Sequence, residues 1–183
     1  MQATVEDTRA ELQDFEEVVR LHWQSVYRFI LASVRNADAA HTLTQDCFMR
    51  SYSKRGSFRG QASVKTWLMK IAVNLVHDHV RNRRLQFWKR LRSSGVSPGD
   101  VSDYLPDAAI SPEDRASLNE QVQIIWQTSR SLPERQRTVF LLRFVEDMDL
   151  LEIAAATGMK EGTVKIHLFR ALHAIRERLG RSG

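Results

Sequence analysis

The segment from residue 161 to residue 174, EGTVKIHLFRALHA, carries side chains that could read the base edges of DNA. Arg170 and Lys165 can donate hydrogen bonds to guanine or phosphate, and the apolar Ile166 and Phe169 suit thymine methyl groups. At 3.6 residues per turn, one face of this helix is predicted to be buried, with Val164, Leu168, Ala171, Leu172, Ile175 and Leu179. The outward face is predicted to carry Thr163, Ile166, Phe169, Arg170 and His173.

Such a face needs a helix-turn-helix to present it, and the preceding residues fit that motif. Ala154 is small enough for two helices to cross closely, Gly158 can adopt the left-handed turn, and Val164 packs the second helix onto the first. The second helix would then enter a major groove. One alternative stays open, in which Ile166 and Phe169 pack on a neighbouring helix or on a protein partner.

A second cationic surface is predicted within residues 64–92, which hold eight basic residues against the single acid Asp78. Lys70, Asn74, His77 and Arg81 recur there at helical spacing, and this polar stripe suits contacts with DNA. A basic helix that is merely solvated is the alternative.

A loop before this helix is a candidate for holding an unpaired base. Gly56 and Gly60 break the helical pattern around Phe58 and Arg59, an aromatic and a cation that could line such a pocket. Phe58 could equally anchor the loop to its domain. The spacing of Trp67 favours core packing over base stacking.

Enzymatic chemistry is not expected from this sequence. His77, Asp78 and His79 stand together, but residues two apart on a helix diverge by about 200°, so the two histidines cannot share a metal ion. No nucleophile motif or phosphate-binding loop is present, and we expect no cofactor and no metal.

Composition is typical of a folded, intracellular protein with a polyanionic partner. The chain has 183 residues, 43% of them hydrophobic, and a formal net charge of +5. Its single cysteine, Cys47, cannot form an internal disulfide. The start is acidic and no apolar run could span a bilayer, so we expect a cytoplasmic location without membrane insertion.

Hydrophobic periodicity predicts an all-α fold of two small helical domains joined by a flexible linker. Apolar stripes predict helices beginning near Phe15, from Asp38 to Tyr52, and from a cap at Ser63. Residues 93–111 are rich in Ser, Gly, Pro and Asp and are predicted to be the linker. The domains are therefore predicted as 1–92, a three-helix bundle, and 112–183, four helices whose starts include Pro112 and Pro133.

The chain resembles the extracytoplasmic-function (ECF) sigma factors, the minimal promoter-recognition subunits of bacterial RNA polymerase. LTQDCFMRSY (43–52), SFRG (57–60) and VKTWLMKIAVNLVHDHVRNRR (64–84) resemble region 2 of that family. LPERQRTVFLLRF (132–144) and EGTVKIHLFRA (161–171) resemble region 4. The resemblance covers most of the chain outside the N-terminus and the predicted linker.

This resemblance implies three groups of contact residues. Binding to the −35 promoter element is implied for Arg143, Thr163, Lys165, Ile166, His167, Phe169 and Arg170. Binding to the −10 element and strand melting are implied for Ser57, Phe58, Arg59, Lys70, Asn74, Asp78, Arg81 and Arg84. Docking on core RNA polymerase is implied for Leu43, Gln45 and Asp46.

The sequence also departs from the family at two places. His41 and Thr42 replace an acidic pair common before Leu43, which removes charge that would face the polymerase. Ile166 and His167 replace a common serine and arginine, which points to an unusual promoter sequence.

Core RNA polymerase, promoter DNA and a membrane-bound anti-sigma factor are the partners that the resemblance implies. The main alternative is a helix-turn-helix repressor or activator whose first 92 residues sense a ligand or dimerise. A phage-type adaptor that binds polymerase but not DNA is disfavoured by the two DNA-facing helices.

Overall fold

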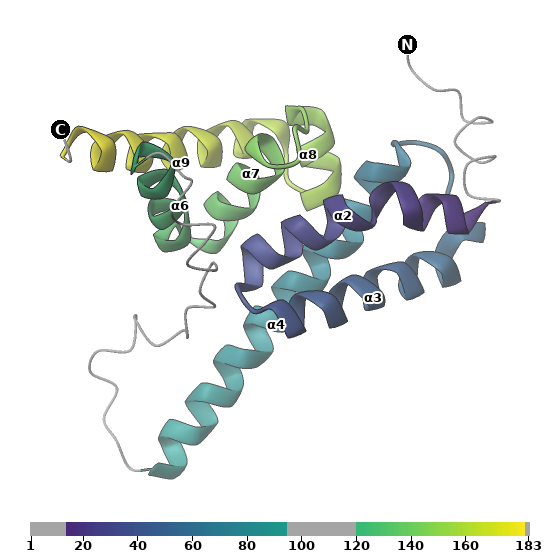
Figure 1. Ribbon diagram of the computed structural model, residues 1–183, viewed down its shortest axis with the longest axis horizontal. Coiled ribbons are helices and arrows are strands. Elements are labelled where there is room, and N and C mark those ends of the chain that lie inside the picture. Colours follow the sequence, from purple (N-terminus) through teal and green to yellow (C-terminus); the bar gives the residue numbers. More distant parts are fainter. Residues whose placement is uncertain (1–13, 95–119, 182–183) are drawn as a thin grey trace.

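The computed structural model describes residues 14–94 and 120–181, and within those ranges the regular structure is entirely helical (Figure 1). The first range contains α2 (Phe15–Val34), α3 (Ala37–Lys54), the short 3-10 turn η1 (Arg55–Ser57) and α4 (Val64–Ser94). The second contains α6 (Glu120–Ser131), α7 (Glu134–Phe144), α8 (Leu150–Thr157) and α9 (Glu161–Gly180). The prediction of an all-α fold is confirmed.

Helices α2, α3 and the first half of α4 form a bundle around the predicted apolar stripes. Asp14 caps α2 by accepting from the Glu17 N–H at 3.2 Å, and Asn36 caps α3 by accepting from the Ala39 N–H at 2.8 Å. The buried side chains of this bundle include Val26, Phe29, Ile30, Ala40, Cys47, Leu68, Met69 and Ala72. Each of the three helices contacts the other two, so these apolar faces are buried against one another.

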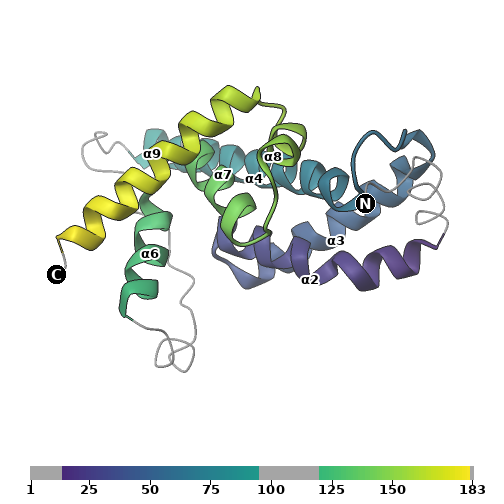
Figure 2. The ribbon, with the colours of Figure 1, turned by 90° about the horizontal axis from the view of Figure 1, so that it is seen from above.

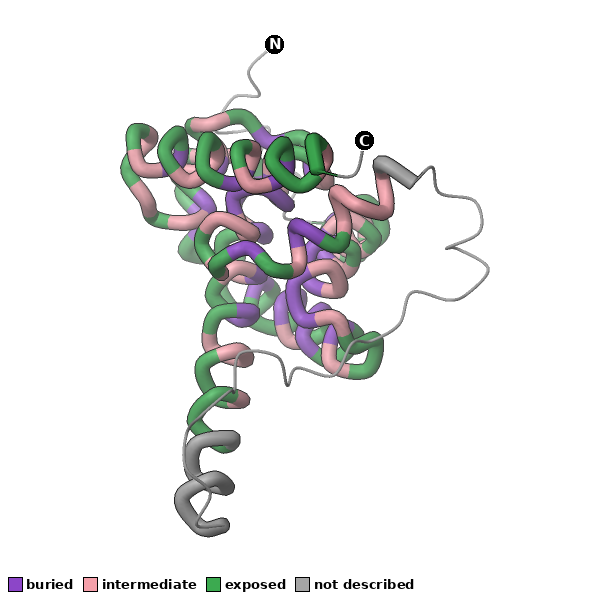
Figure 3. The backbone as a smooth tube through the Cα atoms, turned by 90° about the vertical axis from the view of Figure 1, so that its left-hand side faces the viewer, coloured by how far each residue is buried: buried purple, intermediate pink, exposed green. Residues whose placement is uncertain are grey.

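Helix α4 begins where the sequence predicts and extends further than it predicts. Ser63 accepts from the Thr66 N–H at 3.1 Å, as expected of a cap. The helix then runs to Ser94, and its C-terminal half projects away from the bundle (Figures 1 and 3). Ser93 and Ser94, predicted to open the linker, are therefore helical, while the rest of that linker and the helix start at Pro112 lie outside the described residues.

The second bundle packs α6, α7 and α8 against α9. Its core contains Val139, Leu142, Ile153, Val164, Ala171 and Ile175. Leu168, Leu172 and Leu179 were predicted to be buried on α9 but are only half-buried, because this helix is covered along one narrow stripe. No helix in residues 14–94 or 120–181 is long and apolar enough to cross a membrane.

The two bundles pack against each other, which the prediction of tethered modules did not include. Helix α2 contacts α7 and helix α4 contacts α8, so that segments far apart in the sequence lie side by side (Figures 1 and 2). The buried apolar side chains of both bundles belong to one continuous cluster. The described structure is therefore a closed arrangement of the two modules.

Cys47 is expected to be almost inert in the folded protein. Its side chain is fully buried, with Sγ 3.6 Å from the Leu68 carbonyl oxygen, and burial raises the pKa of the thiol to about 12. At pH 8 only about one thiol in 10⁴ would be ionised, against roughly a quarter of ordinary cysteines. Iodoacetamide should thus alkylate the native protein about 10³-fold more slowly than the urea-unfolded protein, as measured by mass spectrometry. Equal rates would contradict the buried position.

Candidate nucleic-acid interface

Helices α8 and α9 form the predicted helix-turn-helix. An Asp149–Glu152 capping box starts α8, and Gly158 ends it in the left-handed conformation (φ 71°) with its N–H donating to the Ala154 carbonyl at 2.9 Å. Val164 is fully buried where α9 begins. These features fix the angle between the helices and leave the opposite face of α9 pointing outward.

The turn predicts opposite effects for two glycine-to-alanine substitutions. A Cβ at Gly158 would contact nothing within 4 Å, so Gly158→Ala should lower the free energy of unfolding by about 1 kcal/mol through backbone strain alone. Gly162 lies within α9 and is equally unobstructed, so Gly162→Ala should raise that free energy by up to about 1 kcal/mol. Urea unfolding measures both, and a change of the same sign in both variants would contradict the assignment.

The outward face of α9 exposes two large apolar side chains among cations. Ile166 is 52% and Phe169 is 65% exposed, so neither packs on a neighbouring helix in the described part of the chain. Lys165 and Arg170 are exposed on the same helix, and Lys165 forms an ion pair with Glu161 at 2.6 Å. Thr163 is half-buried at the start of the face. The predicted reading face is thus open, available to a base edge or to a protein.

Two further residues implied for the −35 element have constrained surroundings. The Arg143 guanidinium donates to the Met148 carbonyl oxygen at 2.9 Å and so braces the turn before α8. His167 is half-buried, and its burial, together with Arg135 and Arg170 nearby, lowers the pKa of its imidazole. The lowered pKa favours the uncharged imidazole at neutral pH, so His167 contributes little positive charge to this face.

The polar stripe of α4 forms the second candidate surface. Lys70, Asn74 and Arg81 are exposed, as is Arg84 one turn further on. Asp78 is half-buried and pairs with Arg81 at 3.1 Å. Exposed pairs of this kind contribute roughly 0–1 kcal/mol, so Arg81 can exchange this partner for a phosphate at little cost.

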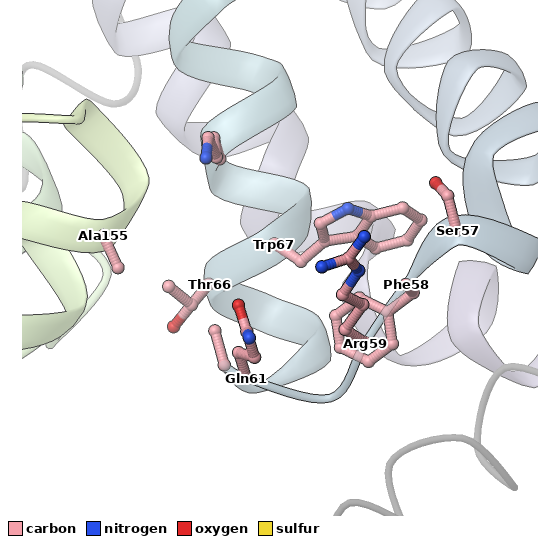
Figure 4. A pocket seen from close by; sticks show the side chains of 9 residues that line it. Ser57, Phe58, Arg59, Gln61, Thr66, Trp67 and Ala155 are labelled. Carbon is pink, nitrogen blue, oxygen red and sulfur yellow. The ribbon is translucent and has the colours of Figure 1, made fainter.

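A hollow of about 420 Å³ lies between the loop after η1 and α4 (Figure 4). The exposed Arg59 borders it, and the loop turns at Gly60 with a φ of 69°, a conformation that favours glycine. Its lining includes Ser57, Phe58, Arg59, Gln61, Trp67 and Lys70. The hollow is large enough for a planar ring and combines aromatic with polar walls.

The structure describes how Phe58 and Trp67 contribute to this hollow. Phe58 is only 6% exposed, and its ring centroid lies 5.1 Å from that of Trp67. Phe58 therefore anchors the loop to the bundle in this state, which was one of its two predicted roles. Trp67 is half-buried, so it belongs partly to the core and partly to the wall.

The residues implied for polymerase docking are separated by the fold. Leu43 is buried in the bundle, so it supports α3 from inside and does not present a contact surface, whereas Gln45 is exposed and Asp46 half-buried. A shallow hollow of about 350 Å³ on the same helix is lined by Asp46, Met49, Arg50, Ser53 and Lys54. Met49 is 69% exposed and is a docking candidate that was not predicted from the sequence. The signal for it was an apolar side chain on the otherwise polar outer face of this helix.

The histidines near Asp78 do not converge. His77 is exposed with Nδ1 3.9 Å from the Asp78 carboxylate, whereas the half-buried His79 has Nε2 without a hydrogen-bond partner. Burial and then Arg83 lower the pKa of His79. Across the described ranges, no group of three or more His, Cys, Asp or Glu side chains is placed to hold a metal ion.

Comparison with known families assigns a class to each bundle. The model of sigma-70 region 2 matches residues 18–86, and the model of sigma-70 region 4 matches residues 123–175. These ranges contain the α4 stripe with its hollow and the α8–α9 motif, respectively. Sigma-70 regions 2 and 4 on one chain define a sigma factor of bacterial RNA polymerase.

Individual relatives narrow this class. The chain is 31% identical over 172 residues to the RNA polymerase sigma-H factor of Pseudomonas aeruginosa, covering 91% of this chain and 86% of that protein. It is 32% identical over 137 residues to the ECF RNA polymerase sigma-E factor of Escherichia coli, covering 73% and 70%. The solved sigma factor RpoE of Bartonella quintana, bound to the anti-sigma factor NepR, matches with a TM-score of 0.73 and 26% identity over 92% of this chain and 98% of that one. The chain belongs to the extracytoplasmic-function sigma factors.

Proposed function

We propose that this protein directs promoter-specific initiation by placing α9 on the −35 element, α4 and the preceding loop on the −10 element, and α3 on core RNA polymerase. The observation that carries the proposal is the coexistence, on one chain, of an open apolar and cationic face on α9 and a basic stripe on α4. A single regulatory helix-turn-helix has no need of the second surface.

Specific recognition of the −35 element is assigned to the outward face of α9. Arg170 and Lys165 can contact guanine or phosphate, and exposed Ile166 and Phe169 can contact thymine methyl groups. Uncharged His167 can donate or accept one hydrogen bond, which differs from a permanent cation in the bases it favours. Thr163 and Arg143 would position the helix ends beside the phosphate backbone.

The −10 element is assigned to α4 and the hollow beside it. Lys70, Asn74, Asp78, Arg81 and Arg84 line the helix that would follow the duplex, with the cations on phosphates. A base leaving the stack needs an aromatic wall and polar partners, and the hollow between Arg59 and Trp67 offers both. Phe58 supports that wall from behind, and Ser57 lies at its rim.

Core polymerase would dock on α3 through Gln45, Asp46 and Met49. The exposed His41 packs edge-on against Trp23, with ring centroids 5.8 Å apart, so this position supplies an aromatic contact in place of a carboxylate. We expect this docking surface to depend more on apolar contact with Met49 than on charge.

An anti-sigma factor is the proposed negative regulator. The Bartonella quintana relative is solved in complex with the anti-sigma factor NepR, which supports regulation of this kind. We propose a membrane-bound partner that covers both modules of a cytoplasmic protein, and no catalytic activity in the chain itself.

Run-off transcription with purified core polymerase tests the proposal. The template would be a promoter selected from a random library by the assembled complex of core polymerase and this protein. Initiation should require the full chain and should be lost in the paired variant Lys70→Ala with Asn74→Ala, whereas Arg176→Ala, an exposed cation elsewhere, should leave it intact. Binding to DNA without any initiation would favour the repressor or activator alternative.

A further inference from the structure

Glu146, in the connection between α7 and α8, is a buried carboxylate whose described side-chain partners all come from the other module. Only 1% of the surface of Glu146 is exposed to solvent. Its carboxylate accepts hydrogen bonds from the Ser25 hydroxyl and from Arg28, whose Nε and Nη2 lie 2.9 and 3.2 Å from its two oxygens. Lys65 on α4 donates to the backbone carbonyl oxygen of the same residue.

A buried carboxylate is stable only where its partners compensate for lost hydration. Because Ser25 and Arg28 lie on α2, the compensation exists only while the two modules touch. Arg28 keeps about half of its side chain exposed, so water can reach the pair from one side. Glu146 raises the pKa of Arg28 through their hydrogen bonds, as expected of a real ion pair.

The same contact places α8 beside the proposed −10 surface. Thr66 on α4 donates to the Glu152 carboxylate at 3.3 Å, and Ala155 of α8 forms part of the wall of the hollow beside Trp67 (Figure 4). The first helix of a helix-turn-helix normally crosses the DNA backbone. In the closed arrangement α8 faces α4 instead.

The closed arrangement is also too small for two promoter elements at once. Elements named for positions −35 and −10 are about 25 base pairs apart, or roughly 85 Å along a straight duplex at 3.4 Å per base pair. A compact body of about 140 residues is roughly 40 Å across, and even the projecting α4, with 31 residues, is only roughly 46 Å long. The modules must therefore separate before both can bind.

We propose that Glu146 is the latch of an autoinhibited closed state, which withholds α8 and the base-binding hollow from promoter DNA until the modules part. The inhibitory part of this inference rests on the proposed function. Like charges oppose the latch at the same interface, since Arg137 on α7 is half-buried and its pKa is lowered by burial and then by nearby Arg35. Because this repulsion offsets part of the attraction between Glu146 and Arg28, a partner that binds the open state can shift the equilibrium away from the closed one.

Energy transfer between two labels tests the latch without DNA or polymerase. Labels can be attached to cysteines introduced at the exposed positions Gln24 on α2 and Leu151 on α8, which lie on the two sides of the contact between the modules, because Cys47 is inert at the pH of labelling. The labelled protein that keeps Glu146 and Arg28 should give a single population with high energy transfer. Glu146→Gln and, from the other side, Arg28→Ala should each raise the open fraction about 10-fold or more.

Two comparisons separate this result from general damage. Asp147→Asn removes a charge from the exposed neighbouring residue and should leave the energy transfer unchanged. The charge-swapped double variant, Arg28→Glu with Glu146→Arg, should restore part of the high transfer that either single variant loses. Circular dichroism checks that each variant keeps its helices. Folded Glu146→Gln and Arg28→Ala variants that stay closed would overturn the latch, as would equal opening by Asp147→Asn.

A duplex-binding measurement tests inhibition. Glu146→Gln should bind the selected promoter duplex about 10-fold more tightly than the unsubstituted protein, in the absence of polymerase. An open variant without this gain would overturn the inhibitory part. Failure of the unsubstituted protein to initiate with core polymerase would instead refute the proposed function, whatever the transfer measurement gives.

Discussion

Alanine at Arg170 is expected to weaken binding to a −35 duplex by roughly 5- to 150-fold, the equivalent of about 1–3 kcal/mol. Arg170 is exposed on α9 beside Phe169, where its guanidinium can donate two hydrogen bonds to guanine. The loss should be largest on the selected sequence and smaller on random duplex, because a phosphate contact alone would weaken both equally. Fluorescence anisotropy at fixed salt measures the two affinities.

Arg176→Ala is the matched control for that variant. It removes the same charge from the same helix at an exposed position six residues later, which points roughly 120° away. Only a small, sequence-independent loss is expected. Binding to a premelted −10 template should be the same in both variants, and weaker binding by Arg170→Ala would contradict the division of labour between α9 and α4.

Alanine at Leu142 is expected to lower the free energy of unfolding by about 3 kcal/mol or more. Leu142 on α7 is fully buried where α7 packs against α9. Truncation removes the transfer free energy of the lost methyl groups and leaves a cavity that the surrounding helices fill only in part. Urea unfolding followed by circular dichroism measures the shift in midpoint at unchanged slope.

Leu151→Ala is the matched control for Leu142→Ala. Leu151 lies on α8 and is 67% exposed, so the same substitution should change the free energy of unfolding by less than about 0.5 kcal/mol. Similar losses at both positions would contradict the assignment of the effect to burial, since alanine has the higher helix propensity and cannot destabilise an exposed helix position in that way.

Helix positions could be predicted from the sequence because each depends on local spacing. The stripe through Val26, Phe29 and Ile30 repeats at the helical period, and Ser63 has the chemistry of a cap. The end of α4 was missed because Ser93 and Ser94 have the composition of a linker, although serine is tolerated where a helix already propagates.

The packing of the modules could not be predicted in the same way. A glutamate such as Glu146 is usually solvated, and only the arrival of Arg28 from a distant helix makes its burial possible. The outward face of α9 was predictable, since angle alone separates Ile166 and Phe169 from Val164. The burial of Phe58 depends on its contact with the Trp67 ring, which lies on another element, so residue spacing could not predict it.

Glu152 joins two equilibria that are usually independent. One of its carboxylate oxygens accepts from the Asp149 N–H at 2.9 Å at the start of α8, and the other accepts from Thr66 on α4. Parting of the modules therefore removes a neighbour from the residue that holds the first turn of α8. Amide hydrogen exchange in that turn should accelerate when the chain opens, so fraying of a single helix end reports the state of the whole molecule.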